Sequence, residues 1–562
     1  MAYHAVKGGI DHAGLSSYAL PPGQQTGKYS QHLKKHLPLQ STAPELNALQ
    51  LPMNIRNRRV SKKVVCTPLH EALEAELNRL EDRGGHVEPP PQNEWSTTFR
   101  RHPRRVVAGD DRKVYPVALY LDGIKFTRSI GPGKADSAML ITGYNLMTYK
   151  RHVLYVLSKR EMCRCGCRGW DTLWGCFNHL RWSLSAAADG TRPLVRWDGQ
   201  PWDASSMYAA ANLESTELKN RYVVVQIKAD LAELCGSLGL PTWASINNPC
   251  FMCGTCKSDM FDFTGVGLDD NPWGNKTATY DNVCTSCEHE TRKIPFTVMF
   301  WRSHYDHKHR KLDWTNCRNP LFAPQLGISI DTLRLDTMHT LYLGVFSRYV
   351  HAVITSVIQE NMYGIDGRKE DVEDVTCRLL FNDYKQWCID NQVDLSYQLN
   401  TLLPTMVGVD GPFIKAKAAE TGVLLRWAAG FCSSEGHRLN NGELLRVAGD
   451  TLVEYIDRLR ASAFKVPWKT CQELLDLCLR HIFVMTEMGF SSTPKFHMWV
   501  HMTCNIPQHG NPVFYSTFVD ETLNLTVARM SASAHRATWE ESIFLRCRLL
   551  PVLQADTYLA CV

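Results

Sequence analysis

The sequence predicts an α/β protein whose strand-containing region is followed by a long helical segment. Between residues 112 and 240, short apolar runs typical of β-strands alternate with segments of helical periodicity. From residue 340 to residue 490 the periodicity is almost entirely helical. The composition, with 44% hydrophobic and 21% charged residues, is that of a globular protein. It excludes a wholly disordered chain, a collagen and a coiled-coil rod.

The length of 562 residues suggests about three domains, or one domain with a large insertion. The net charge of +5 is too small to identify a nucleic-acid-binding protein from charge alone. The unusual feature of the composition is its 20 cysteines beside 21 histidines. Many of these cysteines are separated by only one or two intervening residues. The chain also begins without the basic and apolar stretches of a signal peptide. We therefore expect an intracellular protein with thiolate metal ligands rather than disulfides.

The most apolar stretch, residues 340–358, is interrupted by Arg348 and His351. A membrane-spanning helix needs about 20 largely apolar residues, so this stretch predicts a buried helix and no membrane contact.

Residues 1–66 are rich in Gly, Pro, Gln and Lys, which predicts a flexible basic arm without a packed core. Within it, residues 54–63 carry five basic residues. Such a run is typical of a nuclear-import signal, of a phosphate-binding arm or of a solvated tail. Residues 67–111 predict a short amphipathic helix over 67–86 that docks on the body of the protein, followed by a linker.

The segment 112–240 predicts the first part of the α/β core. The apolar run over 114–126 predicts a strand that leads into a turn at Asp122-Gly123, and residues 141–158 supply two further strands. A helix over 170–190 ends at a glycine, and residues 221–240 begin as a buried strand and continue as a helix from Asp230. Residues 241–493 are first Cys/His-rich and then helical, and residues 494–562 contain a His pair and a final amphipathic helix.

Four acids are candidates for metal binding. Asp122 and Asp230 each follow an apolar strand, which would hold a carboxylate in a defined position, and Asp520 and Glu521 stand together near the start of a predicted helix. Each has an ordinary alternative: Asp122 as a turn residue, Asp230 as a helix N-cap, and the last two as a solvated pair in a first turn. Three converging acids could bind two Mg²⁺ ions for phosphoryl chemistry.

Cysteine and histidine spacings predict zinc sites. Cys250-x2-Cys253 and Cys284-x2-Cys287 have the spacing of zinc knuckles and could form one site of four thiolates. Alternatively, the first pair joins His497 and His501, which share one face of a helix because they are four residues apart. Less certain ligands are Cys256 and the alternating Cys163, Cys165 and Cys167, the last three completed by Cys176 or His179.

A further pair of polar residues with metal-binding side chains lies in the segment LDTMH, residues 335–339. Asp336 and His339 are one helical turn apart, just before the apolar helix. They form either an N-terminal cap or a local pair of ligands, and the cap is slightly favoured.

Taken in order, these pieces resemble the catalytic domain of CACTA-type DDE transposases and, more distantly, the catalytic subunit of the V(D)J recombinase. The resemblance covers roughly residues 114–545. It rests on Asp122-Gly123, on Asp230 with Cys250-x2-Cys253 twenty residues later, and on His497-x3-His501 followed by Glu521. The LDTMH segment also looks like the LD-x-MH block of CACTA proteins.

The resemblance implies an RNase H-like core, a mixed sheet with flanking helices, interrupted by a mainly helical, zinc-containing insertion. It assigns Asp122, Asp230 and Glu521 as the acids that bind Mg²⁺ or Mn²⁺, with Asp520 as the alternative third acid. It assigns the zinc ligands as Cys250, Cys253, His497 and His501. The implied activity is cleavage and transfer of DNA strands.

The same resemblance implies a nuclear protein that binds transposon ends and target DNA and forms a homo-oligomer. Four arginines just before the first strand would contact DNA phosphates: Arg100, Arg101, Arg104 and Arg105. The alternative function is that of a transposase-derived zinc- and DNA-binding protein without cutting activity.

Overall fold

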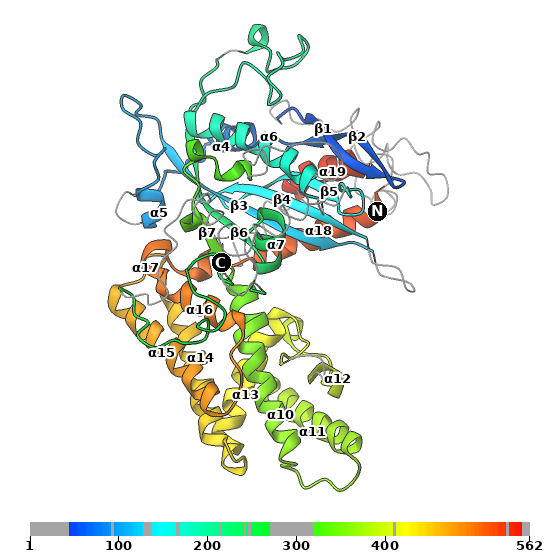
Figure 1. Ribbon diagram of the computed structural model, residues 1–562, viewed down its shortest axis with the longest axis vertical. Helices are drawn as coiled ribbons and strands as arrows, with labels where there is room; N and C mark the ends of the chain where they lie inside the picture. Colours follow the sequence, from blue (N-terminus) through cyan, green and yellow to red (C-terminus); the bar gives the residue numbers. More distant parts are fainter. Residues whose placement is uncertain are drawn as a thin grey trace.

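The computed structural model describes residues 44–553, apart from 92–94, 128–135, 165–168, 214, 241–242, 245–248, 270–318, 408–411 and 535–538. Figure 1 shows an α/β part in its upper half and a bundle of long helices below it. The predicted α/β class is confirmed.

The α/β part is built on a mixed sheet of five strands in the order β5-β4-β3-β6-β7. Strands β3, β4 and β5 form an antiparallel meander, while β6 runs parallel to β3 and β7 parallel to β6. Every residue of β6 is buried, as expected of a strand covered on both faces. The strands are β3 (Val114–Lys125), β4 (Ser137–Asn145), β5 (Arg151–Ser158), β6 (Arg221–Ala229) and β7 (Leu333–Leu335).

Strand β3 is longer than the sequence predicted. The parallel pairing with β6 ends at Leu121 opposite Ala229, which is where the Asp122-Gly123 turn was expected. The antiparallel pairing with β4 continues to Lys125, so β3 runs straight through that dipeptide. Asp122 and Asp230 each follow the last paired residue of neighbouring strands, and they therefore lie at the same edge of the parallel pair.

Helices cover both faces of the sheet, and the alternation of side chains along β3 decides which residues meet which helix. Leu119 and Leu121 face the main core, together with α6 (Trp170–Asp189) and α4 (Leu69–Asp82). Ile124 faces the opposite way, into a second cluster formed with α18 (Phe518–Ser533) and α19 (Trp539–Leu553). Asp122 has the same parity as Ile124, so its side chain is on the α18 side.

Part of the predicted flexible arm is ordered, which corrects the sequence prediction for residues 47–66. They form an antiparallel hairpin of β1 (Asn47–Ile55) and β2 (Arg58–Cys66). Arg56 and Asn57 adopt positive φ angles of 50° and 61°, which suit a two-residue turn whose twist matches the strands. Alternate residues of β1 are buried against α6, and the basic residues of β2 near the turn are exposed. The sequence prediction failed because those exposed basic residues dominate the composition.

The helical part begins with a continuous apolar helix, Met338–Gln359, composed of the π-helical η7 (Met338–Phe346) and α10 (Ser347–Gln359). Among the described residues this is the one helix long and apolar enough to cross a membrane, and 72% of its most apolar window is buried inside the protein. The predicted buried helix is therefore confirmed. The other long helices of this part are α11 (Lys369–Asp390), α13 (Ala418–Glu435), α14 (Gly442–Ala461) and α15 (Trp468–Glu487).

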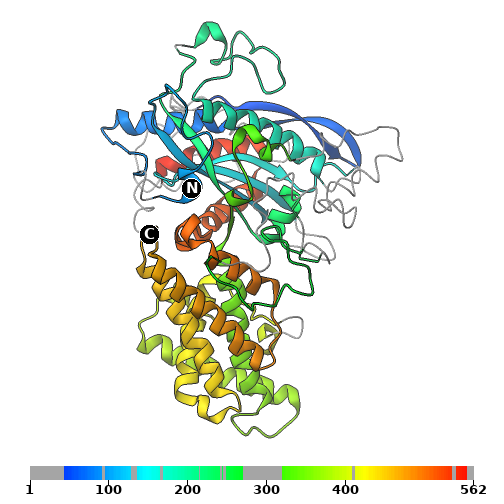
Figure 2. The ribbon, with the colours of Figure 1, turned by 60° about the vertical axis from the view of Figure 1, so that its left-hand side comes forward.

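The chain then returns from the helical part to the sheet. The short helices α16 (Pro494–Cys504) and α17 (Ile506–His509) follow α15, and α16 packs against both η7 and β7. Figure 2 shows α18 and α19 running back beneath the strands of the sheet. The final helices therefore belong to the α/β part although they follow the helical segment in sequence.

Candidate functional site

The first candidate acid, Asp122, is held by neighbours on both β3 and α18. The Tyr120 hydroxyl donates to its Oδ2 at 3.0 Å, and the backbone N–H of Gly123 donates to its Oδ1 at 2.6 Å. The amide of Asn524 on α18 donates to the same Oδ2 and, at 2.8 Å, to the Tyr120 oxygen. Tyr120 is two residues before Asp122, so the strand's alternation directs both side chains to α18.

The adjacent acids Asp520 and Glu521, the two candidates for the third acid, point in different directions. Asp520 is completely buried and accepts from Lys228 Nζ at 2.6 Å and from Arg151 Nε at 3.0 Å. Its two oxygens are thus committed to cations of β6 and β5. Burial lowers the pKa of Lys228, but the charge of Asp520 outweighs burial and raises that pKa above its ordinary value. Asp520 is a structural anchor for α18.

Glu521 faces Asp122 instead. Its Oε1 lies 3.3 Å from the Tyr120 hydroxyl, the same group that contacts Asp122 at 3.0 Å. The two carboxylates therefore lie within about 6 Å of each other. The side chain of Glu521 is 35% exposed, so it also reaches solvent. This places the acid implied by the resemblance beside Asp122, although the two are 521 − 122 = 399 positions apart in the sequence.

Asp230 serves as the N-cap of α7 (Leu231–Leu238), because its Oδ1 accepts from the Glu233 N–H at 2.6 Å. The ordinary alternative from the sequence is thus confirmed. Asp230 nonetheless adds a negative charge to the same region, since it contributes to raising the pKa of both Asp122 and His339. A capping carboxylate retains free lone pairs, so capping does not prevent a second contact.

Asp336 takes the favoured one of its two predicted roles, that of a cap, because its carboxylate accepts from a backbone N–H at the start of η7. Asp336 Oδ2 accepts from the backbone N–H of His339 at 2.8 Å and lies 2.6 Å from its Nδ1. Asp336 Oδ1 accepts at 2.8 Å from the N–H of Thr517, the N-cap residue of α18. This buried carboxylate therefore links the start of η7 to the start of α18. The Nε2 atom of His339 faces Glu521, 4.0 Å from its Oε1.

The electrostatics of these groups show an excess of negative charge. Burial, followed by the charge of Glu521 and then that of Asp230, raises the pKa of Asp122 to about 6. Burial lowers the pKa of His339, but the hydrogen bond and charge of Asp336, with the charges of Asp230 and Glu521, raise it above its usual value. The two shifts share one contribution, the negative charges of Glu521 and Asp230, so the site favours the addition of positive charge.

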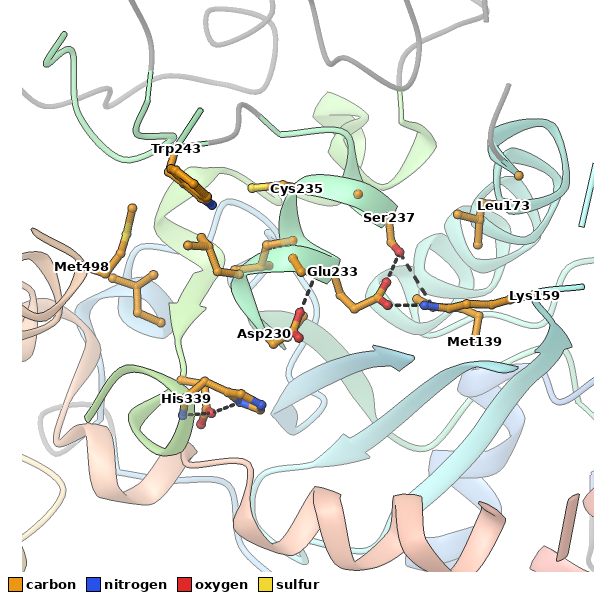
Figure 3. Close-up of a pocket in the computed structure, with 18 of the residues that line it drawn as sticks. Met139, Lys159, Leu173, Asp230, Glu233, Cys235, Ser237, Trp243, His339 and Met498 are labelled. Carbon is orange, nitrogen blue, oxygen red and sulfur yellow. Dashed lines mark hydrogen bonds and ion pairs between the residues drawn. The ribbon is translucent and has the colours of Figure 1, made fainter. Parts of the chain in front are cut away.

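A cavity of about 890 Å³ is lined by Asp230, Asp336 and His339. Figure 3 shows Asp230 and His339 on its lower wall, with Trp243 and Met498 on the opposite side. Lys159 pairs with Glu233 near Gly123, and Lys495 adds a second cation. Burial lowers the pKa of Lys495 to about 8. The cavity is therefore polar at the acids and apolar at its far wall.

The four ligands predicted from the CxxC and HxxxH spacings come together in the structure. The Sγ and ring-nitrogen atoms of Cys250, Cys253, His497 and His501 all lie within 4.8 Å of one another, and all four residues are buried. Within the part of the chain that the structure describes, this is the one group of three or more such ligands at that separation. It joins the loop after α7 to α16.

The geometry of this Cys/His cluster fits a metal ion. His497 Nδ1 lies 2.8 Å from the carbonyl oxygen of Met260 and must donate to it, so in the neutral ring Nε2 carries the lone pair that a metal ligand needs. That Nε2 lies 3.4 Å from Cys253 Sγ and 3.0 Å from His501 Nε2. Tetrahedral zinc with its usual bond lengths separates such atoms by about 3.3–3.5 Å. The cluster is compatible with zinc.

Contacts with the same cluster also affect the Cys250 thiol. Burial alone would raise its pKa, but hydrogen bonds from Cys253 and the two histidines, with the charge of His501, lower it well below its ordinary value. The Met252 N–H points at the same sulfur, 3.2 Å away. These are the surroundings of a thiolate, which is the form of cysteine that binds metal.

The other predicted cysteine ligands lie elsewhere. Cys256 contacts Ser258 and Asp259 and is not part of the Cys/His cluster. Cys163 lies near Asp171, whereas His179, proposed to complete its site, contacts Tyr155 and Cys66. Cys163 and His179 therefore contact different groups, and among the described residues neither belongs to the candidate metal cluster. The remaining candidates lie outside the described residues: Cys165, Cys167, Cys284 and Cys287.

The four arginines lie far from the acids. The guanidinium of Arg221, the first residue of β6, donates to the carbonyl oxygens of Arg104 and Arg105, whereas Asp230 follows the opposite end of that strand. At about 3.3 Å per residue, nine residues of strand separate the two places by about 30 Å. Arg104 also pairs with Asp189. Phosphate contacts by this run, including the exposed Arg100 and Arg101, would concern DNA distant from the acids.

Sequence reasoning missed the groups that support the acids. Tyr120 and Asn524 position Asp122, and Lys228 with Arg151 fixes Asp520. The one available signal was a lysine at the end of an otherwise apolar strand, because a buried lysine needs an acidic partner.

Comparison of the chain with models of known protein families found no match, and comparison with curated proteins found none either.

Proposed function

We propose that this protein cleaves and joins DNA strands in the manner of a DDE transposase, using divalent cations held by Asp122, Asp230 and Glu521. One observation carries the proposal: residues from β3, the end of β6 and α18 bring three carboxylates to one end of a mixed sheet, where Asp230 also lines a cavity. Structural acids usually pair with cations, as Asp520 does, whereas these three raise one another's pKa or that of a neighbour.

We infer that the mixed sheet and its helices form an RNase H-like core interrupted by the helical segment. Support comes from strands of both directions in one sheet and from a final helix that returns to β3. In this interpretation the Cys/His cluster binds zinc and ties the loop after α7 to α16. A metal crosslink of this kind would limit the entropy of the long excursion between Asp230 and Glu521.

Asp122, Asp230 and Glu521 would hold the two cations, which would supply activation of a water or 3′-hydroxyl nucleophile and charge stabilisation of the leaving oxygen. The protein's own groups provide the position for this chemistry. Tyr120 and Asn524 fix one oxygen of Asp122, the anchor at Asp520 holds α18 so that Glu521 faces Asp122, and Lys495 offers a cation to a phosphate in the cavity.

The test is a nicking assay on supercoiled plasmid DNA with Mg²⁺ or Mn²⁺. The wild-type protein is expected to convert supercoiled to open-circular DNA, and Glu521→Gln and Asp122→Asn are expected to reduce the rate at least a hundredfold. Glu443→Gln, a change at an exposed acid of α14, is the matched control and should retain full activity. Cation-dependent nicking that survives both changes in the acid cluster would refute the proposal.

A further inference from the structure

His339 belongs to the wall of the cavity and faces the acids. It lies at the start of η7, and Figure 3 shows its ring projecting beneath Asp230. Its side chain is 25% exposed, so the ring is accessible from the cavity although its base is buried. The function proposed above gives this residue no role.

The orientation of the ring is set by Asp336. An ionised carboxylate only accepts hydrogen bonds, so the 2.6 Å contact requires that Nδ1 of His339 carry a proton. Asp336 is itself held by two backbone N–H groups, those of His339 and Thr517, each at 2.8 Å. The ring therefore has little freedom, and its second nitrogen, Nε2, is directed at the acids.

The distance from Nε2 to Glu521 Oε1 is 4.0 Å, which is too long for a hydrogen bond. Two ligand atoms of one ion with bonds of about 2.1 Å lie between about 3 Å and 4.2 Å apart, depending on the angle between them. The separation is therefore within the range that one cation can bridge. A histidine that ligates a metal usually donates its other ring N–H to a carboxylate, as His339 does.

We propose that Nε2 of His339 is a nitrogen ligand for a divalent cation held together with Glu521, and that Asp336 is its positioning residue. This inference rests on the proposed function, because it adds a fourth ligand to the same acid cluster. A site with nitrogen as well as oxygen ligands binds Mn²⁺ more tightly than Mg²⁺, since imidazole is a poor ligand for the harder ion.

The experiment measures the bound ion directly. The protein is first loaded with one equivalent of zinc, so that the Cys/His cluster is filled, and Mn²⁺ is then titrated and followed by electron paramagnetic resonance. Spin-echo spectra of the bound Mn²⁺ are expected to show coupling to a nitrogen-14 nucleus. His339→Gln should remove this coupling and weaken Mn²⁺ binding about tenfold or more. His437→Gln, an exposed change in the helical part, should alter neither.

A second variant separates ligation from folding. His339→Asp offers an oxygen ligand at the same place, so it should retain bound Mn²⁺ while losing the nitrogen coupling. Wild-type Mn²⁺ without nitrogen coupling, or coupling that persists in His339→Gln, would overturn the inference and leave the proposed function standing. Mn²⁺ binding that is absent, or that Asp122→Asn leaves unchanged, would overturn both.

Discussion

Asp520 and Glu521 are neighbours in sequence, yet the structure predicts opposite consequences for neutralising them. Asp520 has no exposed surface. Its carboxylate neutralises the ammonium of Lys228, whose side chain is 1% exposed. Asp520→Asn would leave that ammonium buried without a counter-charge, and breaking a buried ion pair in this way costs about 3–5 kcal/mol. Glu521→Gln changes a side chain that is 35% exposed, and its effect on stability should be below about 1 kcal/mol.

The pH dependence of the stabilisation by the Asp520–Lys228 ion pair follows from the raised pKa of Lys228. The ammonium is charged in both the folded and the unfolded protein below pH 10.5, so the stabilisation is fully present at neutral pH. It is lost only as the pH rises through the higher folded value. Measurements at pH 7 therefore capture the whole effect.

The assay is thermal unfolding of each zinc-loaded variant, combined with hydrogen exchange of α18. Asp520→Asn should lower the midpoint by about 3–4 °C and speed exchange in α18, whereas Glu521→Gln should do neither. Adding Lys228→Met to Asp520→Asn should recover part of the loss, because the uncompensated charge is then gone. Equal stability of the two single variants would refute the assignment of Asp520 as the anchor.

Three further predictions concern other parts of the molecule. Without Mg²⁺ or Mn²⁺, Asp122→Asn should raise the free energy of unfolding at pH 8 by up to about 3 kcal/mol. The reason is that the folded protein raises the pKa of the Asp122 carboxyl from 3.8 to about 6, which penalises its ionised form. Thermal unfolding should show this gain shrinking as the pH falls below 6 and disappearing near pH 3.8. Cys253→Ser should abolish bound zinc in elemental analysis, whereas Cys256→Ser, three residues later but outside the cluster, should retain it. Gly442→Ala should destabilise the helical part by more than about 2 kcal/mol in urea unfolding, since its Cβ would overlap the Gly436 carbonyl, whereas Gly430→Ala within α13 should be neutral or stabilising.

Local pattern was sufficient for most individual elements. The buried strand over 221–229 and the helix ended by Gly190 follow from apolar periodicity and from a residue suited to the left-handed conformation. The i, i+4 spacing of His497 and His501 places both rings on one face of α16 through the period of the helix alone. These features depend on neighbours within a few residues, so a single sequence contains them.

The composition of residues 1–66 predicted a flexible arm and not the hairpin of β1 and β2, because that hairpin depends on distant parts of the chain. Its burial depends on α6, more than 100 positions later, and its exposed basic residues conceal the alternation of apolar ones. The end of β3 was also misplaced, because the pairing with β4 continues after the pairing with β6 has stopped.

By itself, the sequence determined the class of the fold, the strands and helices that bear the acids, and the two ligand pairs of the Cys/His cluster. Only the tertiary structure decided that Asp520 turns to Lys228 while Glu521 turns to Asp122, because one residue along a helix rotates a side chain by about 100° and only the position of the sheet shows which direction is inward. It likewise decided that Asp336 orients His339 toward Glu521, since that arrangement joins the starts of two helices that are distant in sequence.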